Sequence, residues 1–175
     1  HPLPRDDTPD RQGRAEPLSR NRRATQRAAP PVELAFRGHA IPSDMDAVRE
    51  IVNATGFFTP DEVDMAVELV DAGIAGGSIS DYRFLFCEDK SGAVLGYTCY
   101  GPVPCTVGSF DLYWIAVHPR HQGSGIGKEL LERTQEKIRS LGGMRIYIET
   151  ASRDLYRPTR RFYARCGYRR EALLK

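Results

Sequence analysis

The sequence predicts a mixed α/β domain, and three patterns support this fold class. A strand at residues 110–117 turns through glycines into a helix at 125–141, and a second strand follows at 144–151. Two more strands, at 82–88 and 93–100, are joined by a short turn. Helix start signals lie upstream of this hairpin. Because short turns join antiparallel strands and helical crossovers join parallel ones, the sheet should contain both kinds of pairing.

The first 31 residues differ from the rest of the chain. They hold six prolines, seven arginines and four acids, with almost no large apolar side chain. Such a composition cannot bury enough apolar surface to offset the entropy of ordering a backbone. We expect residues 1–31 to form a disordered arm or linker. Residues 32–175 are expected to form one domain, for which an overall apolar content of 41% is sufficient.

The charge balance argues against several classes of partner. The arm carries a net charge of +3 and the rest of the chain −1, so no nucleic-acid groove is indicated. No apolar run is long enough to span a bilayer or form a signal core. Neither the four cysteines nor the four histidines have metal-ligand or disulfide-framework spacing. We expect a cytoplasmic protein with reduced thiols and with no metal, membrane or nucleic-acid partner.

The first elements should be a strand and two helices. A strand is expected at 32–40, and Ser43 then offers a hydroxyl cap to a helix with early acids. The second helix has a stronger start signal, because Thr59 is followed by a proline and by Glu62, the pattern of a capping box. Its apolar residues recur on one face until the glycines at 73–77.

Turn residues set the remaining boundaries. Residues 89–92 read D-K-S-G and join the hairpin, and G-P-V-P at 101–104 should stop its second strand. Two glycines at 142–143 end the long helix. A last helix is expected at about 157–166, ending at Gly167.

The most informative stretch runs from Val117 to Gly127 and reads V-H-P-R-H-Q-G-S-G-I-G. It joins a strand to a helix, so several unpaired backbone N–H groups lie at the positive end of that helix. Phosphates bind well at such a position. We interpret the stretch as a pyrophosphate cradle, and the alternative is a tight connection that binds nothing.

Two common nucleotide-binding loops do not fit this stretch. A nucleoside-triphosphate loop aligned on Gly127 and Lys128 needs a glycine and a hydroxyl residue where the chain has Gln122 and Glu129. A dinucleotide loop starting at Gly123 needs glycine at 128, where the chain has Lys128. It also needs an acidic strand end about 20 residues on, in a second βαβ unit, and none follows. We therefore exclude both classes.

A third pattern does fit. The motif Q/R-x-x-G-x-G/A is filled by Gln122, Gly125 and Gly127, directly after a strand that ends in V-x-P. Residues 161–168 read R-F-Y-A-R-C-G-Y and look like the F-Y-x-x-x-G-[FY] signature. Together the two motifs resemble the GNAT acetyltransferase superfamily, which binds acetyl-coenzyme A. The resemblance covers roughly residues 32–175.

For the fold, the resemblance implies a GNAT domain of the mixed, α+β-like α/β type. Its central sheet would be mostly antiparallel, with one parallel βαβ pair splayed at the coenzyme A site and about four flanking helices. The superfamily order is β-α-α-β-β-β-α-β-α-β. The last strand is expected to be truncated, because the chain stops soon after Tyr168.

The resemblance also implies how acetyl-coenzyme A would be held. The pantetheine arm would pair with the strand before the loop, and the loop N–H groups would face the pyrophosphate. A basic cluster surrounds the last helix; one or two of its members are candidates to reach coenzyme A phosphates, and the others a solvated face. The cluster is Arg153, Arg157, Arg160, Arg161 and Arg165. The implied donor-binding residues are Ile115, Val117, Gln122, Gly123, Ser124, Gly125, Ile126, Gly127 and Lys128.

Three residues are candidates for catalysis. Tyr163 matches the superfamily tyrosine that protonates the departing thiolate, and a phenol pKa of about 10 is close to that of a thiol; the alternative is a packing role. Asp111, on the strand beside the thioester, is the first candidate for the base, acting through water or with a pKa raised by burial; the alternative is an aspartate that satisfies nearby backbone groups at the strand start. Glu149, in the strand-like run M-R-I-Y-I-E-T, is the second, and its alternative role is to bind the ammonium group of the acceptor.

The implied function is transfer of an acetyl group from acetyl-coenzyme A to a primary amine, directly, in a ternary complex. The acceptor is expected to be a small amine or amino-acid-like. Phe57 and Phe58, between the first two helices, would line its site or belong to the core. A protein or peptide N-acetyltransferase and a non-catalytic acyl-coenzyme A-binding module remain alternatives. A homodimer and a fusion to another domain also stay open.

Overall fold

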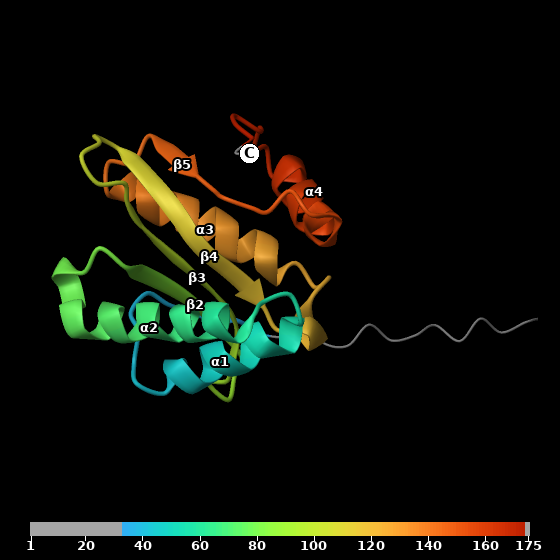
Figure 1. The fold of residues 1–175 in the computed structure, drawn as a ribbon. Helices are drawn as coiled ribbons and strands as arrows, with labels where there is room; N and C mark the ends of the chain where they lie inside the picture. Colours follow the sequence, from blue (N-terminus) through green and yellow to red (C-terminus); the bar gives the residue numbers. More distant parts are fainter. Residues whose placement is uncertain (1–32, 174–175) are drawn as a thin grey trace, which may run out of the picture. The chain divides into compact units, whose positions relative to one another are not determined.

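The computed structural model describes residues 33–173, and the five strands in this range form one sheet in the order β1-β2-β3-β4-β5 (Figure 1). Successive strands pair antiparallel, except that β4 and β5 pair parallel. This confirms the mixed sheet predicted from the hairpin and the βαβ unit. The arm expected at 1–31 lies outside the described residues. The strands are β1 (Ala35–Arg37), β2 (Arg83–Glu88), β3 (Val94–Pro102), β4 (Ser109–Val117) and β5 (Arg145–Tyr147).

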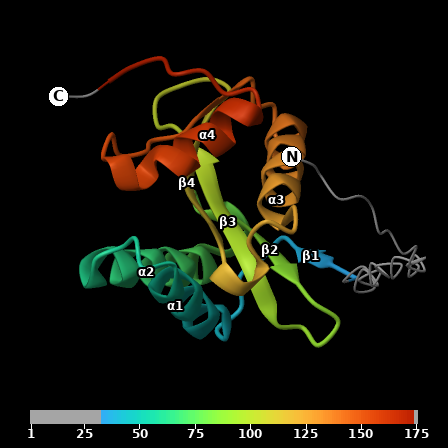
Figure 2. The same ribbon diagram turned by 90° about the vertical axis from the view of Figure 1, so that its right-hand side faces the viewer.

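Helices cover both faces of the sheet. Helices α1 and α2 lie on one face, and α3 and α4 lie on the other (Figures 1 and 2). Val48 and Val70, from α1 and α2, share a core cluster with Phe86 of β2. Leu131 of α3 packs in a different cluster, with Leu112 of β4. The helices are α1 (Asp44–Thr55), α2 (Pro60–Gly76), α3 (Ile126–Ser140) and α4 (Arg157–Arg165), with 3-10 turns at Gly77–Ile79, Pro119–His121 and Asp154–Tyr156.

The starts of α1 and α2 are capped in different ways. At α2 the predicted capping box is present: the Glu62 N–H donates to Thr59 Oγ1 at 3.3 Å, and the Thr59 N–H donates to the Glu62 carboxylate at 2.7 Å. At α1 the predicted hydroxyl cap is wrong, because Ser43 makes no side-chain cap hydrogen bond. The next residue, Asp44, accepts from the Ile41 N–H at 2.8 Å instead.

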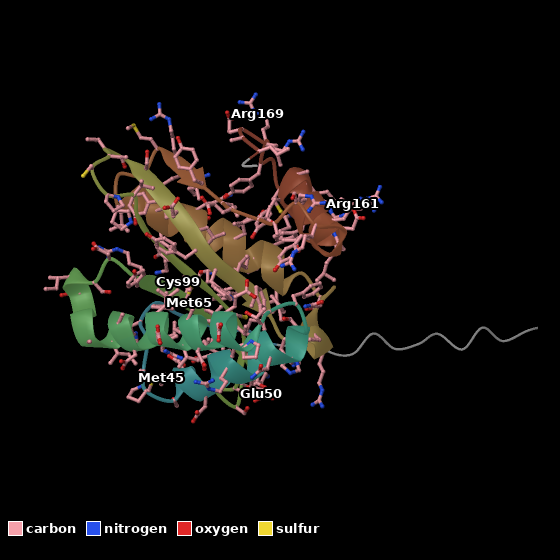
Figure 3. All side chains as sticks on the ribbon, in the orientation of Figure 1. Met45, Glu50, Met65, Cys99, Arg161 and Arg169 are labelled. Carbon is pink, nitrogen blue, oxygen red and sulfur yellow. The ribbon has the colours of Figure 1, made fainter. Side chains whose placement is uncertain are left out.

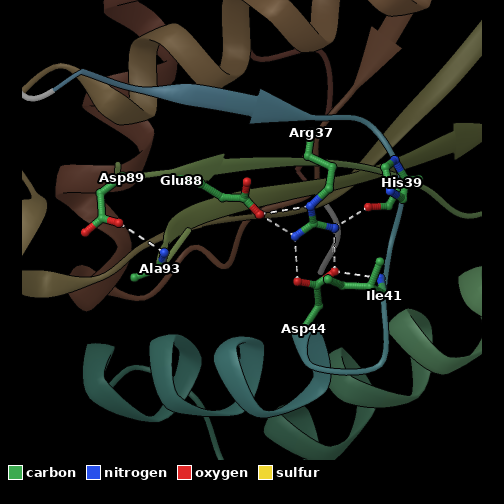
Figure 4. A network of polar contacts seen from close by, with 7 residues as sticks. All are labelled: Arg37, His39, Ile41, Asp44, Glu88, Asp89 and Ala93. Carbon is green, nitrogen blue, oxygen red and sulfur yellow. Dashed lines mark hydrogen bonds and ion pairs between the residues drawn. The ribbon is translucent and has the colours of Figure 1, made fainter. Parts of the chain in front are cut away.

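Asp44 belongs to an ion-pair network that fastens α1 to the sheet (Figure 4). The Arg37 guanidinium donates twice to Asp44, at 2.8 Å each, and twice to Glu88, at 2.9 and 2.6 Å. It also lies 4.7 Å from the centroid of the Phe86 ring. Asp44 is only 1% exposed. Because Arg37 is on β1 and Glu88 on β2, the network fixes the position of the first turn of α1.

Some strands differ in length from expectation. β1 covers three residues rather than 32–40, and β3 runs on through Gly101 and Pro102, where a stop is predicted. β5 ends at Tyr147 rather than at 151, because its neighbour β4 pairs with it over three residues only. The segment 168–173 forms no strand, so the final strand of the superfamily order is not present in the part of the chain that the structure describes.

A bulge in β4 sets the direction of its side chains. The β3–β4 register shifts at Tyr113, which is left as an extra residue on β4. Leu112, the residue before the bulge, packs in the cluster beneath α3 and α4. Because successive side chains of a strand alternate between faces, Asp111 points to the α1–α2 face. The Tyr113 ring is on that face too, 5.6 Å from the ring of Tyr82.

Candidate active site

The parallel strands β4 and β5 separate shortly after they meet. Their pairing covers Ser109 to Asp111 on β4 and Arg145 to Tyr147 on β5. β4 continues to Val117, so among the described residues its edge toward β5 has no strand partner past Asp111. In Figure 1 the chain after β5 leaves β4 and crosses to α4. We call this separation the β4–β5 opening; it is the splay expected of the parallel pair.

Two residues of β4 direct their backbone groups toward the opening. The His118 N–H donates to the Leu95 carbonyl of β3 at 2.9 Å. Backbone groups of successive residues alternate between the two edges of a strand, so those of Val117 and Ile115 face the opening. The Val117 carbonyl accepts a hydrogen bond from the Gln122 side-chain amide at 3.0 Å. Ile115 and Val117 therefore present their backbone where pantetheine is expected to pair.

The glycines of the loop adopt a conformation that other residues rarely take. Gly123 has a φ of 76° and Gly125 a φ of 94°, both in the left-handed region. A Cβ atom at either residue would meet nothing within 4 Å, so the space in front of them is open. The Ser124 hydroxyl donates to the His121 carbonyl and holds the loop in shape. No side chain caps the start of α3 at Gly125.

The first turn of α3 is backed by apolar side chains. Ile126 is buried, with 5% of its surface exposed. A Cβ on Gly127 would lie 3.7 Å from the Val117 side chain and 3.8 Å from that of Phe162. The helix start therefore lies directly between the end of β4 and helix α4. This backing holds the N–H groups of the loop in place on its other side.

Within residues 122–128, Lys128 contributes the only cationic side chain. It is exposed, and its ammonium lies 3.5 Å from Glu132 one turn later. With its uncapped N–H groups, open front and rigid backing, the loop fits a pyrophosphate. Its donors are backbone groups rather than side chains.

Tyr163 is held on α4 by a packed apolar cluster. Its side chain is 9% exposed, and its ring centroid lies 5.9 Å from that of Tyr168. Burial raises the pKa of Tyr163, and the neighbouring Tyr168 raises it further. The phenol thus keeps its proton at neutral pH, but its pKa lies further above that of a thiol than the ordinary value of about 10 that the sequence suggested. The cluster around it includes Tyr100, Phe110, Leu112, Leu131 and Ile138.

Asp111 and Glu149 share the face opposite Tyr163. Partial burial raises the pKa of Asp111, and the negative charge of Glu149 raises it further. The placement of Glu149 within a strand is wrong: β5 ends at Tyr147, and Glu149 follows on an exposed, unpaired segment. Ile148 packs in the cluster beneath α4, and the charge of Glu149 acts on Asp111, so the two carboxylates lie near each other. The two candidate bases therefore act on one surface.

The loop between α1 and α2 approaches the same region. Phe58 packs against Trp114 of β4 in a tilted arrangement with ring centroids 5.0 Å apart, and it also packs on the core beneath α1 and α2. Phe57 lies 6.2 Å from Tyr156, just before α4. Both phenylalanines are half-buried. The loop thus touches β4 and the start of α4, on either side of the opening.

Three aromatic residues near the candidate bases have no clear sequence signal. Tyr82 and Tyr113 form an edge-to-face pair on the Asp111 face, and the charge of Asp111 contributes to a raised pKa of Tyr113, after burial. The Trp114 indole N–H is buried and has no hydrogen-bond partner among the described residues. The bulge at Tyr113 brings these side chains together, and it breaks the alternation by which a strand face is read from sequence.

Two searches of the described residues gave negative results. Within 33–173, no three histidine, cysteine, aspartate or glutamate side chains come together as a metal site requires. In the same range, no helix is long and apolar enough to cross a membrane.

Comparison with known proteins identifies the family. The acetyltransferase (GNAT) domain family matches residues 80–170, which is more than half of the chain and includes the loop, β4, β5 and α4. No curated protein matches the chain by sequence.

Solved structures agree with this match. A protein from Desulfovibrio desulfuricans, assigned to the GNAT acetyltransferase family, is 45% identical, with a TM-score of 0.77 over 82% of this chain and 89% of that one. Two others share the fold at low identity. A Pyrococcus furiosus protein assigned as an acetyltransferase is 17% identical, with a TM-score of 0.62 over 82% and 97% of the two chains. AAC(6')-Iy, solved with the bisubstrate analogue CoA-S-monomethyl-acetylneamine, is 14% identical, with a TM-score of 0.60 over 82% and 96%.

The splayed parallel strands, the uncapped glycine loop and these matches define one class of protein. The chain belongs to the GNAT acetyltransferase family, and it is an acyltransferase. Members of this family transfer an acetyl group from acetyl-coenzyme A to an acceptor substrate.

Proposed function

We propose that this acetyltransferase acetylates the primary amine of a small or amino-acid-like acceptor, by direct transfer while donor and acceptor are bound together. One observation carries the proposal: Asp111 is the last residue of β4 that pairs with β5, and Tyr163 packs in the cluster of the next residue, Leu112, on the opposite face of the strand. A base is thus available on one face of the opening and an acid on the other. Direct transfer to an amine needs both groups.

The donor supplies a thioester, which is an activated acyl group. In the proposed step the amine nitrogen attacks the thioester carbonyl carbon, a C–N bond forms and the C–S bond breaks. An ammonium acceptor loses two protons: one leaves through Asp111 to solvent, and the equivalent of the other reaches sulfur from Tyr163, which is then reprotonated. A backbone N–H of Ile115 or Val117 would stabilise the oxyanion, a contribution of about 3 kcal/mol.

The surroundings of Asp111 suit this role. An ordinary aspartate, with a pKa of about 4, is a weak base for an ammonium group of pKa about 10. Burial and the charge of Glu149 narrow this gap by raising the pKa of Asp111. Proton transfer through a water to bulk solvent would also spare Asp111 from holding the proton.

The same face suits a cationic acceptor. Asp111 and Glu149 are both anionic, and the charge of Asp81 also acts on Tyr113. The paired rings of Tyr82 and Tyr113 lie among these carboxylates. Carboxylates attract an ammonium group, and aromatic faces bind one with about 0.5–2 kcal/mol. These contacts favour an amine over a hydroxyl acceptor.

The direct test is release of coenzyme A thiol from acetyl-coenzyme A over a panel of monoamines, diamines, amino acids and lysine-containing peptides. We expect release with at least one small amine and none with matched alcohols. Initial rates at varied concentrations of both substrates should give intersecting double-reciprocal lines, the pattern of a ternary complex. Parallel lines would instead show an acetyl-enzyme and overturn direct transfer.

The same assay separates the alternatives. Strong preference for a peptide would assign the protein to the protein-acetylating class. Tight binding of acetyl-coenzyme A with no thiol release for any amine would favour a non-catalytic acyl-coenzyme A-binding module.

A further inference from the structure

Helices α1 and α2 leave one corner of their sheet face without cover. In the described part of the chain, the cluster beneath these helices includes Trp114 and Ala116 of β4 but no residue of β5. Figure 1 shows β5 on the side of the sheet farthest from α1 and α2. Tyr113 of β4 and Tyr147 of β5 are 36% and 45% exposed. A surface beside the β4–β5 opening therefore stays accessible to a ligand.

Tyr147 stands beside Asp111 on this surface. Phe110 and Ile146 are partners in the parallel pairing of β4 with β5, and both pack in the cluster beneath α3 and α4. Successive side chains of a strand alternate between faces, so the next pair, Asp111 and Tyr147, points to the other face. An aromatic ring thus lies next to the candidate base, on the strand that borders the opening.

Gly101 of β3 makes room for a second ring. A Cβ atom there would overlap the Asp81 carbonyl oxygen and lie 3.0 Å from the Tyr113 ring. Gly101 is also the register partner of Asp111 on β4. Tyr82, the residue after Asp81, places its ring 5.6 Å from that of Tyr113. One glycine therefore has an aspartate on either side and two tyrosine rings nearby. We call this surface the open corner; it consists of Asp81, Tyr82, Asp111, Tyr113 and Tyr147.

The open corner is negatively charged. The charge of Asp111 and, to a smaller extent, that of Asp81 contribute to the raised pKa of Tyr113, after burial. Glu149 adds a third carboxylate, whose charge acts on Asp111. Within residues 33–173, none of these three carboxylates forms an ion pair with a basic side chain. The negative charge of this surface is therefore available to a cationic ligand.

The arginines of α4 lie on the other side of the sheet. Helix α4 packs there in the cluster that contains Tyr163. Figure 3 shows Arg161 on α4 and Arg169 beyond it, with both side chains directed outward. Arg145 of β5, two residues before Tyr147, is on the same face as that tyrosine, but it is not ion-paired with any of the three carboxylates. The open corner thus keeps its negative charge.

We propose that the open corner binds a second ammonium group of the acceptor, so that the substrate is a short aliphatic diamine. This inference rests on the proposed acetylation of an amine at the β4–β5 opening. Asp111 and Glu149 take the amine that reacts. Asp81 and the rings of Tyr82 and Tyr113 take the amine that does not.

The spacing of these two subsites suits a short carbon chain. Asp111 pairs with Gly101 and Asp81 lies against it, so the two aspartate backbones are about two strand spacings apart, roughly 10 Å. A short diamine spans this separation together with the two side chains. An ammonium group at its far end meets a carboxylate and aromatic faces, and both attract it. A methyl group there meets only the rings, and a carboxylate is repelled by the aspartates.

The test uses three acceptors that have the same number of carbons and differ in the charge of the far end: putrescine, butylamine and γ-aminobutyrate. Thiol release by the full chain at saturating acetyl-coenzyme A gives kcat/KM for each. The value for putrescine is halved, because it has two equivalent amines. We expect putrescine to exceed butylamine by about tenfold or more, and γ-aminobutyrate to fall below butylamine.

Variants of the open corner test the assignment of residues. Asp81→Asn and Tyr113→Leu should each reduce the preference for putrescine over butylamine severalfold, chiefly by raising KM for putrescine. Tyr113→Phe keeps the ring and should keep the preference. Because the preference compares two substrates on one enzyme, a fraction of unfolded protein does not change it. The charge control is Glu136→Gln on α3, which is exposed on the opposite face of the sheet and should keep the preference.

The outcomes separate the inference from the function on which it rests. Equal kcat/KM per amine for putrescine and butylamine, or an unchanged preference in either Asp81→Asn or Tyr113→Leu, would overturn the diamine assignment and leave amine acetylation intact. An equal loss of preference in Glu136→Gln would also overturn it, because the preference would then follow the net charge of the protein. Thiol release with none of the amines in the wider panel would contradict the proposed function itself.

Discussion

Asp111 points to one face of strand β4, and Tyr163 of helix α4 packs on the other face of the same strand. Leu112 packs in the cluster that holds Tyr163, and its neighbour Asp111 points the other way, toward Glu149. Asp111, on one face of β4, is thus only one residue away from the side chain that contacts the Tyr163 cluster on the other face. The pKa values of both groups are raised, chiefly by burial.

Glu149→Gln should move the pH dependence of the enzyme. Asp111 must be ionised to accept a proton, so activity rises with pH through its pKa. Removing the negative charge of Glu149 lowers this pKa toward its ordinary value. The acidic limb of the kcat/KM profile should shift to lower pH, and a profile measured from pH 4 to 9 checks this.

Asp111→Asn is the companion variant. If Asp111 is the base, the rate should fall by about a hundredfold or more at low pH and recover in part as the acceptor amine deprotonates. The free energy of unfolding should change in the other direction, so that the variant loses activity but gains stability. A carboxyl whose pKa is raised by folding destabilises the fold once pH exceeds that pKa, so Asp111→Asn should be slightly stabilising at neutral pH and neutral below pH 3. A uniform rate loss at every pH would make Glu149 the leading candidate.

Tyr163→Phe should lower kcat by about a hundredfold or more, with little change in coenzyme A affinity or melting temperature. The ring that fills the apolar cluster is kept, and only the proton is lost. Tyr168→Phe is the matched control: its hydroxyl accepts from Gln135 at 3.0 Å, so its loss should cost about 1 kcal/mol of stability and leave the rate unchanged. The reverse pattern would give Tyr163 a packing role.

Gly125→Glu should abolish coenzyme A binding without unfolding the domain, because a carboxylate would occupy the position of the phosphate. The substitution also strains the backbone, since Gly125 has a φ of 94°. Gly142→Glu controls for this strain: Gly142 has a φ of 82°, and its Cβ would also meet nothing within 4 Å. Calorimetry should show binding by the Gly142 variant only; unchanged affinity at Gly125 would refute the cradle.

Arg37→Met should destabilise the domain by about 3–5 kcal/mol, because Asp44, 1% exposed, would be left as a buried charge without its partner. Arg49→Met removes an arginine that pairs with Asp64 at 2.6 Å on the surface, where both side chains are about half exposed. That control should cost less than about 1 kcal/mol. Urea unfolding measures both; equal effects would show that the buried network adds no more than a surface pair.

The features that could be predicted from sequence depend on local contacts. The capping box of Thr59 and Glu62 and the hairpin turn at 89–92 each satisfy their hydrogen bonds within a few residues. Gly123 and Gly125 of the loop likewise take a positive φ, a conformation that glycine adopts without help from a distant partner. Each of these signals was sufficient because no distant partner decides the outcome.

The features that could not be predicted depend on distant partners. Ser43 does not cap α1 because Asp44 is bound by Arg37 of β1 and lies at the helix start in its place. Glu149 lies outside β5 because the end of that strand is set by β4. The bulge at Tyr113 likewise comes from the register with β3, which composition does not reveal.

The hydrogen bond from Gln122 to the Val117 carbonyl occupies the strand edge before any donor arrives. A pantetheine amide that takes the place of the Gln122 amide on this carbonyl exchanges one hydrogen bond for another, so the net gain in free energy is small. Affinity then depends mostly on the nucleotide end of the donor. Acetyl-pantetheine, which keeps the reactive thioester but lacks all phosphates, should be a very poor substrate. The enzyme would recognise its donor by the half of the molecule that does not react.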